Sequence, residues 1–513
     1  MKLVFFLLGI IAVIFLQYDL LKPTLEVGLT PDDWSFIFWY KLLGSDPWSK
    51  IGEVWAVRGP YTTVPLYYTG FIHSLVGFDY QKLQLIGILF KTLATLTLFP
   101  LTLIVFKNRL LAILATILFA MSYPSAGALE TAVEPSEYLG MFLMGLFLIT
   151  YFFIVKRNLL SFKWLSLATI MLIFTILMSV MRSYPLLVLV PLIEIYLLIQ
   201  TPSMVRLKAS FLRLLFLYSP FLLITAYRPS VILSYISAMP TVLLKVLEGN
   251  WHLVLTPLQG VGYTLPFSAH WGIFGLVSIS SLKDYLSFVL GGPTFIFGLI
   301  ILFLSFVTSK KPWRFFMLAF CLNFILEILV FFIATHYLII PVELRMSFDA
   351  PRIYSTLFGL FILVLAFVYW IEWKIQGQKD NLLLALWVGP AVSFVFICLT
   401  WILASENLGF GGAQDHYLMI PAAGSSIFIG GLLVLAYEKA KKIRLRWFKN
   451  VTLFLIFITL VGFYLLNRNL IHSYFNHANA NGRAAAGQQM LQSRFREKIK
   501  DVNLKPAALF YFD

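Results

Sequence analysis

Two adjacent carboxylates, Asp32 and Asp33, follow the first long apolar run of the chain within the sequence Thr30-Pro31-Asp32-Asp33-Trp34. Threonine is a favoured N-cap, proline suits the first helical position, and acids in the first turn complement the helix dipole. The aromatic residues that follow are typical of a helix lying on a bilayer. A carboxylate held at such a helix start can act as a general base or a metal ligand. Asp32 and Asp33 are therefore the candidate catalytic residues, and the sequence leaves open which of them is the base.

A second acidic cluster, Glu130, Glu134 and Glu137, precedes a later apolar run. The spacing would place the three acids on one helix face, but Pro135 interrupts that geometry, so part of the segment is expected to be a loop. If this cluster faces the first one, Glu134, Glu137 and Asp33 could complete a site for a divalent cation such as Mg²⁺ or Mn²⁺. A solvated loop is the alternative that the spacing leaves open.

Arginines near the same membrane face are candidates for phosphate binding, because a leaving phosphate needs fixed positive charge as its own negative charge develops. Arg345 and Arg352 lead this group, since they lie in one segment together with His336. Arg58 and Arg182 are further candidates. Snorkelling toward the membrane surface is the alternative role for each of these side chains.

Two charged residues, Lys91 and Glu327, lie inside apolar runs. Charges within a membrane are costly and usually face a cavity or a partner. Lys91 and Glu327 could pair with each other, or Lys91 could contact a lipid phosphate. The sequence does not choose between these two roles.

The composition identifies the solvent in which these residues work. Hydrophobic residues make up 60% of the 513 residues and charged residues only 12%, which is far too little polar surface to cover a water-soluble core of this size. The net charge of +15 comes from basic residues that border apolar runs rather than from one soluble face. That pattern fits the positive-inside rule and contact with anionic membrane lipids, and argues against a nucleic-acid partner.

About thirteen apolar runs are long enough, or nearly long enough, to span a bilayer. The expected spans are 2–20, 83–106, 109–123, 138–155, 164–181, 185–200, 213–227, 288–308, 314–334, 354–371, 382–404, 417–437 and 450–466. We therefore expect an all-α polytopic membrane protein with a transmembrane domain over 1–466. Residues 467–513 form a short polar tail.

Basic residues gather on every second connector, so the positive-inside rule puts the N-terminus in the cytoplasm. Thirteen crossings then leave the C-terminal tail outside the cytoplasmic membrane. The expected outer loops, which hold most of the candidate residues, are about 21–82, 124–137, 228–287, 335–353 and 405–416. The first of these loops is long and aromatic and is expected to contain interfacial helices.

This pattern resembles the GT-C superfamily of polytopic glycosyltransferases, which take sugars from polyprenyl-phosphate donors. The resemblance lies in the N-terminal span, the acidic pair that opens the first outer loop, and the short acidic second loop. The segment Asp415-His416-Tyr417-Leu418-Met419-Ile420-Pro421 is similar to an acid-Arg-Tyr-Leu-x-x-Pro stretch in members like the protein O-mannosyltransferases. His416 stands where that stretch has arginine, and the resemblance makes it a further residue for phosphate contact.

The resemblance implies an inverting transfer of a sugar at the outer membrane face, in the service of glycosylation of the cell envelope. One carboxylate, Asp32 or Asp33, would deprotonate an acceptor hydroxyl on a lipid, glycan or protein, and the polyprenyl phosphate would leave. A divalent cation, or Arg345 or Arg352, would stabilise the leaving group.

Three other classes stay open. A polymerase or ligase of lipid-linked glycans would favour arginine and histidine in a large outer loop, yet 228–287 holds His252 and His270 with only Arg228 at its edge. A transporter or flippase would place charges and helix breakers near the bilayer midplane on several spans. A non-catalytic assembly protein is compatible with the same pattern.

Overall fold

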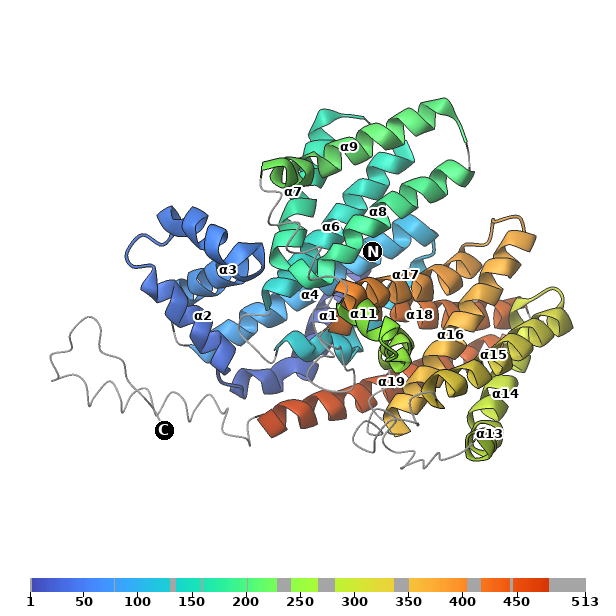
Figure 1. Cartoon of the computed structure of the whole chain (residues 1–513). Helices are drawn as coiled ribbons and strands as arrows, with labels where there is room; N and C mark the ends of the chain where they lie inside the picture. The colour runs from blue at the N-terminus through green and yellow to red at the C-terminus, as the bar shows by residue number, and fades with distance from the viewer. Residues whose placement is uncertain are drawn as a thin grey trace.

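The computed structural model describes residues 2–77, 79–129, 135–157, 160–200, 202–227, 241–265, 282–335, 350–403, 417–442 and 446–478. Across these ranges the chain is helical and contains no β-strand (Figure 1). The prediction of an all-α fold is confirmed for this part of the chain.

Eight of the described helices are long and apolar enough to cross a membrane. They are α4 (Tyr80–Phe106), α6 (Pro135–Arg157), α8 (Val180–Gln200), α15 (Pro312–Thr335), α16 (Ala350–Ile375), α17 (Asn381–Leu403), α18 (Met419–Lys442) and α19 (Arg446–Ala478). The shorter apolar helices are α5 (Arg109–Met121), α7 (Phe162–Met178) and α14 (Pro293–Thr308). The chain is therefore a multi-pass membrane protein.

Each apolar run predicted to span the membrane coincides with a helix, including α1 (Lys2–Leu21) and α9 (Met204–Tyr227). The run at 288–308 was expected to be one helix, but the structure has two there, α13 (Leu282–Gly291) and α14. They are separated by Gly292, and proline occupies the first turn of α14. Glycine ends a helix readily and proline suits a helix start, so the apolar pattern alone hides this break. The count of thirteen crossings stays a prediction.

Two helices, α2 (Pro31–Leu42) and α3 (Ile51–Val76), occupy the segment predicted as the first outer loop. They pack against each other, and Tyr40 lies so close to Gly70 that a methyl group at Gly70 would overlap the Tyr40 ring. α3 also contacts α4, α6, α7 and α8. The pair therefore forms a small unit beside these four helices, at the left of Figure 1.

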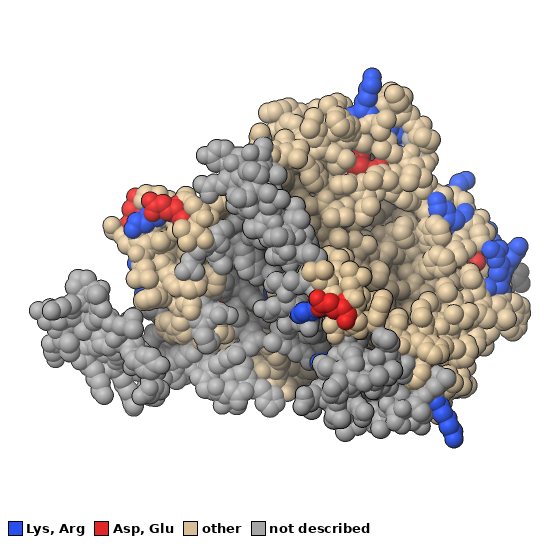
Figure 2. Space-filling view, in the orientation of Figure 1, with Lys and Arg blue, Asp and Glu red and all other residues tan. Residues whose placement is uncertain are grey.

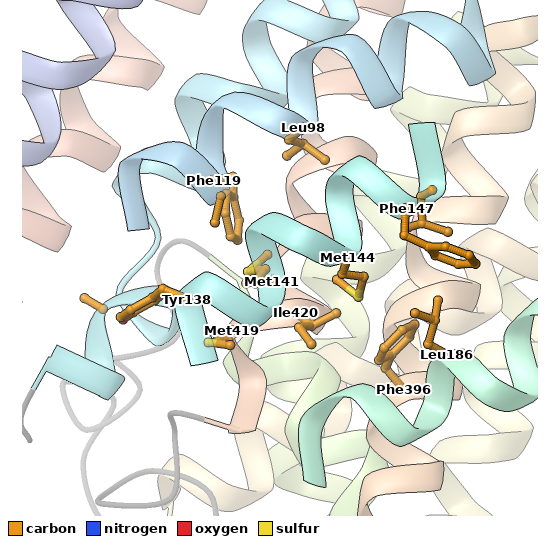
Figure 3. Packing of buried hydrophobic residues seen from close by; sticks show 14 of the residues in the cluster. Leu98, Phe119, Tyr138, Met141, Met144, Phe147, Leu186, Phe396, Met419 and Ile420 are labelled. Carbon is orange, nitrogen blue, oxygen red and sulfur yellow. The ribbon is translucent and has the colours of Figure 1, made fainter. Parts of the chain in front are cut away.

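Two large clusters of buried apolar side chains form the core. The first lies among α4 to α8 and the start of α18, where Figure 3 shows Phe119, Met141 and Met419 close together. The second lies among α14 to α18 together with α11 (Thr241–Leu247) and α12 (Thr256–Tyr263). Because α18 contributes to both clusters, it joins the two halves of the bundle.

The connections that the sequence assigns to the inner face lie near one another. In Figure 1 the α8–α9, α14–α15 and α16–α17 connections lie at the upper right and right, whereas α2 and α3 lie at the left. Figure 2 shows Lys and Arg side chains along that upper and right margin. The basic connectors and the α2–α3 unit therefore occupy opposite sides of the molecule.

The helix α19 continues through the predicted boundary between the transmembrane domain and the tail at residue 467. Its last turns pack on the end of α1, where the Asp19 carboxylate accepts hydrogen bonds from Arg468 Nε, at 3.0 Å, and from the Tyr464 hydroxyl. His472 Nε2 lies 3.0 Å from the backbone oxygen of Asp19. At least the first part of the predicted tail is thus an ordered piece of the bundle, and residues after 478 lie outside the described part.

Candidate functional site

The carboxylate of Asp33 takes part in the start of α2. Its Oδ2 accepts hydrogen bonds from the backbone N–H of Thr30, at 2.8 Å, and from the Thr30 hydroxyl, at 2.9 Å. The Thr30 Oγ1 in turn accepts the backbone N–H of Asp33, which completes a capping box. Asp33 is also fully buried. The predicted helix start is confirmed, and the geometry gives Asp33 a structural role there.

Asp32 precedes Asp33 in the first turn of α2, and its side chain lies outside the described part. The start of α2 is held against the beginning of α4 by a small apolar cluster of Leu29, Ile37 and Leu83. Asp79 caps α4 by accepting the backbone N–H of Lys82, and its ion pair with Lys82 lowers the pKa of the Asp79 carboxyl. The main chain at Asp32 is therefore anchored beside the end of a membrane-spanning helix.

An apolar groove of about 440 Å³ runs between α3 and the adjoining helices α4, α6 and α7. α3 contributes aromatic walls that include Trp55 and Tyr68, while Phe90, Leu139 and Met178 come from the other three helices. Burial raises the pKa of the Tyr68 hydroxyl, which therefore stays neutral. A groove with these walls can hold a hydrocarbon chain, and none of the described residues that line it is charged.

A buried ion pair lies next to one end of this groove. The guanidinium of Arg182, at the start of α8, pairs with the carboxylate of Glu137, at the start of α6. The Arg182 side chain is 3% exposed and that of Glu137 is 21% exposed. The guanidinium also lies over the ring of Tyr417, 5.0 Å from its centroid, so residues from three distant parts of the sequence meet here.

The groove and the ion pair are neighbours because of a close approach at Gly140. A methyl group at Gly140 would overlap Ser179, the residue between α7 and α8. Leu139 and Met178, which line the groove, are the immediate neighbours of these two residues, and Glu137 lies within one helical turn of Gly140. The groove and the Glu137–Arg182 pair are therefore near each other, although neither Glu137 nor Arg182 is among the residues that line the groove.

Lys91 lies at the same depth as this region. Phe90 of α4 and Leu139 of α6 line the same groove, and further along both helices Thr97 is in close contact with Gly145. The pairs Phe90/Leu139 and Thr97/Gly145 follow one another in the same order along both helices, so α4 and α6 run parallel. Lys91 therefore lies level with the first turns of α6.

The Lys91 side chain points toward α5 rather than into the groove. It is 1% exposed, its Nζ lies 5.8 Å from the ring centroid of Phe119, and it has no hydrogen-bond partner among the described residues. The alternative of a pair between Lys91 and Glu327 is wrong, because the Glu327 carboxylate accepts hydrogen bonds from Thr294, at 2.6 Å, and Asn323, at 2.8 Å. Lys91 is thus a buried cation with an aromatic neighbour and no described anionic partner.

No family model matches this chain, and no curated protein matches it in sequence. The functional interpretation therefore depends on the residues and their arrangement.

The other candidate residues are placed only in part. Arg352 lies half-buried in the first turn of α16, and the backbone of Arg58 lies in α3, with its side chain outside the described part. Arg345 and His416 fall outside the described ranges altogether. The structure brings none of these four into a described contact with Arg182.

The predicted cation ligands are not brought together in the part of the chain that the structure describes. Glu137 pairs with Arg182, Asp33 belongs to the capping box, and Glu134, like Glu130, lies outside the described residues. Within the described ranges there is no group of three or more His, Cys, Asp or Glu side chains that could hold a metal ion. The two described members of the predicted set therefore have other partners than a metal.

Sequence reasoning missed a second buried ion pair, between Glu194 of α8 and Arg213 of α9. Arg213 donates from Nε to Glu194 Oε1 and from Nη2 to Oε2, both at 2.7 Å. The hydroxyls of Tyr151 and Ser210 also donate to this carboxylate, at 2.8 and 2.7 Å. Arg213 is the first residue of the expected span 213–227, and the signal that could have found the pair is an acid, Glu194, inside the apolar run 185–200.

We expect Arg213→Met to destabilise the protein by about 3–5 kcal/mol, because it leaves the buried Glu194 carboxylate without its cation. Thermal unfolding of the purified protein in detergent measures the change. Arg206→Met is the matched control, since Arg206 is exposed near the start of the same helix. Equal unfolding temperatures for the two variants would contradict a stabilising role for the pair.

Proposed function

We propose that this chain is a membrane glycosyltransferase of the GT-C type. It transfers a sugar from a polyprenyl-phosphate donor to a hydroxyl of a lipid, glycan or protein acceptor, with inversion at the anomeric carbon. The proposal places the protein in the cytoplasmic membrane with its N-terminus in the cytoplasm and its C-terminus outside. The α2–α3 unit then lies at the outer face, opposite the basic connectors.

The observation that carries the proposal is the apolar groove, whose lining residues Leu139 and Met178 adjoin the Gly140–Ser179 contact near the Glu137–Arg182 pair. A polyprenyl-phosphate sugar has a long hydrocarbon chain, a phosphate and a sugar in that order. The described walls of the groove are uncharged and suit the chain, and the buried guanidinium of Arg182 nearby suits the phosphate. Tyr417, which lies against Arg182, belongs to the late segment, Asp415 to Pro421, on which the sequence resemblance partly rests.

In the proposed reaction Asp32 removes the proton of the acceptor hydroxyl, whose oxygen attacks the anomeric carbon from the face opposite the phosphate. The bond between that carbon and the phosphate oxygen breaks, and its electron pair stays on the phosphate. Arg182 offsets the developing charge. Lys91, which points toward α5, remains a sequence-based candidate for a phosphate contact. Arg58, Arg345, Arg352 and His416 remain sequence-based candidates for further contacts. A divalent cation held by Glu134, Glu137 and Asp33 stays a sequence-based prediction, and no step is assigned to it.

The test is transfer by the purified protein in liposomes that contain radiolabelled polyprenyl-phosphate hexoses, with membrane extract as the source of acceptor. We expect label to move from the donor lipid into acceptor material with one of the donors. A second arm measures direct binding of the unlabelled donors by native mass spectrometry. Neither transfer nor donor binding with any of the hexoses would overturn the proposal.

Filling the groove should weaken donor use. We expect Leu177→Trp, which adds a bulky ring to the groove wall, to raise the KM for the donor about tenfold or more with a smaller effect on kcat, since it removes room for the chain and not a reacting group. Ile170→Trp on the same helix is the control, because Ile170 is exposed and does not line the groove. An unchanged KM for Leu177→Trp would remove the groove from the donor site.

A further inference from the structure

A second pocket lies at the opposite side of the molecule from α2 and α3. It has a volume of about 430 Å³ and lies where the α14–α15 and α16–α17 connections meet (Figure 1). Its lining residues are Lys310, Gln376, Lys379, Asp380, Asn381 and Leu382. This pocket is separate from the groove and from the Glu137–Arg182 pair, and its ligand does not depend on the proposed function.

The pocket is electropositive. Lys310 and Lys379 are both exposed at its wall, and Lys311 lies next to Lys310. Arg314 is in the first turn of α15 and Lys374 in the last turn of α16. The one acid in the lining, Asp380, uses its Oδ1 to accept the backbone N–H groups of Leu382 and Leu383, at 2.8 and 3.2 Å. Because the N–H groups at the start of α17 partly offset the negative charge of Asp380, Lys310 and Lys379 make the larger contribution to the charge of the pocket.

Its hydrogen-bonding groups suit an anion with several oxygens. The ammonium groups of Lys310 and Lys379 donate only, and the side-chain amide of Asn381 adds further N–H donors. The Gln376 Nε2 donates to the Glu372 carboxylate at 3.5 Å, which leaves its other N–H for a ligand. A phosphate with free oxygens can accept from several of these groups at once. A neutral or cationic ligand would leave the lysines without a counterion.

The pocket also adjoins a lipid-facing surface. Phe306 in the last turn of α14 and Trp313 in the first turn of α15 are 55% and 64% exposed, and their rings are in edge contact with centroids 5.8 Å apart. Exposed aromatic side chains beside lysines at helix ends mark the boundary between the hydrocarbon and the headgroups of a bilayer. Lys310 lies between these two residues in the sequence, so the pocket sits at the depth of lipid phosphates.

We infer that this pocket binds the phosphate of an anionic phospholipid from the leaflet next to the basic connectors. Phe306 and Trp313 contact the acyl chains, while Lys310 and Lys379 hold the phosphate. Basic pockets between membrane helices on the cytoplasmic side are suited to such headgroups. The protein thereby carries a resident lipid at the face opposite the groove.

Native mass spectrometry of the full-length protein tests this, with phosphatidylglycerol as the probe and phosphatidylcholine as the zwitterionic comparison. We expect phosphatidylglycerol adducts on the wild type and about thirtyfold weaker binding by the Lys310→Gln/Lys379→Gln double variant. The matched control is Lys441→Gln/Lys442→Gln, which removes two exposed lysines from the last turn of α18 and should leave binding unchanged.

Two further binding measurements use the wild-type protein and require no substitution. Phosphatidylcholine should bind more weakly than phosphatidylglycerol, and millimolar inorganic phosphate should not displace the bound lipid. Equal binding of the two lipids would overturn the inference. Displacement of the lipid by inorganic phosphate would also overturn it and would indicate a site for free phosphate. Full retention of phosphatidylglycerol by the Lys310/Lys379 double variant, or an equal loss in the control variant, would overturn it too.

Discussion

Asp32→Asn is expected to lower sugar transfer by about 10²–10⁴-fold, because an amide cannot take the proton of the acceptor hydroxyl. The side chain keeps nearly the same size, and the first turn of α2 keeps its Thr30–Asp33 capping box. Folding and donor binding should therefore stay close to those of the wild type. The measurements are the transfer rate in liposomes, donor binding by native mass spectrometry, and thermal unfolding.

Asp33→Asn is the matched variant, since it changes the adjacent carboxylate in the same way. Asp33 Oδ2 accepts two hydrogen bonds from Thr30, so the substitution weakens the helix start and should cost about 0.5–2 kcal/mol of stability. Transfer per folded molecule should change far less than in Asp32→Asn. If Asp33→Asn abolishes transfer while Asp32→Asn leaves it intact, the two roles are reversed. Full activity of both variants would remove the acidic pair from catalysis.

Arg182→Met is expected to show two losses at once. It leaves the Glu137 carboxylate without its cation in a largely buried place, which should destabilise the fold by about 3–5 kcal/mol. Under the proposed function it also removes the positive charge that faces the leaving phosphate, with a drop in transfer of about 10²–10³-fold. Thermal unfolding reports the first loss and the transfer rate reports the second.

The double variant Arg182→Met/Glu137→Met separates these two losses. Replacing both members of a buried ion pair by apolar side chains of similar size is often neutral or stabilising, so the unfolding temperature should return toward that of the wild type. Transfer should stay low, because the phosphate still lacks its guanidinium. Recovery of both stability and transfer would show that the pair only supports the fold.

The features predicted correctly from sequence are those with local causes. The start of α2 was read from Thr30 and Pro31, because a helix cap involves residues within one turn of each other. The membrane helices were read from apolar runs, because a span requires a continuous stretch of such residues. The break between α13 and α14 shows the limit of this reading, since Gly292-Pro293 interrupts the helix without interrupting the apolar pattern.

The features that sequence reasoning missed depend on how helices are rotated and paired. The sequence offers Arg182 as one of several candidate phosphate-binding arginines at the outer face. No residue near it along the chain indicates that Glu137 is its partner. Arg213 stands at the edge of the expected span 213–227, yet it lies inside α9 against Glu194. Apolar periodicity says which helices are in the membrane, but lipid and protein neighbours are both apolar, so it does not say which face meets which helix.

The sequence by itself determined that this is a helical membrane protein, where most of its helices lie, and that Asp32 and Asp33 stand at a helix start. Only the tertiary structure decided that Asp33 belongs to a capping box, that Lys91 and Glu327 do not pair, and that Glu137 and Arg182 pair near the groove along α3. The physical reason is the distance along the chain over which each interaction acts. Chain stiffness, capping and hydropathy act between near neighbours, whereas grooves and buried ion pairs arise from helix contacts such as Gly140 with Ser179, which join residues far apart along the chain.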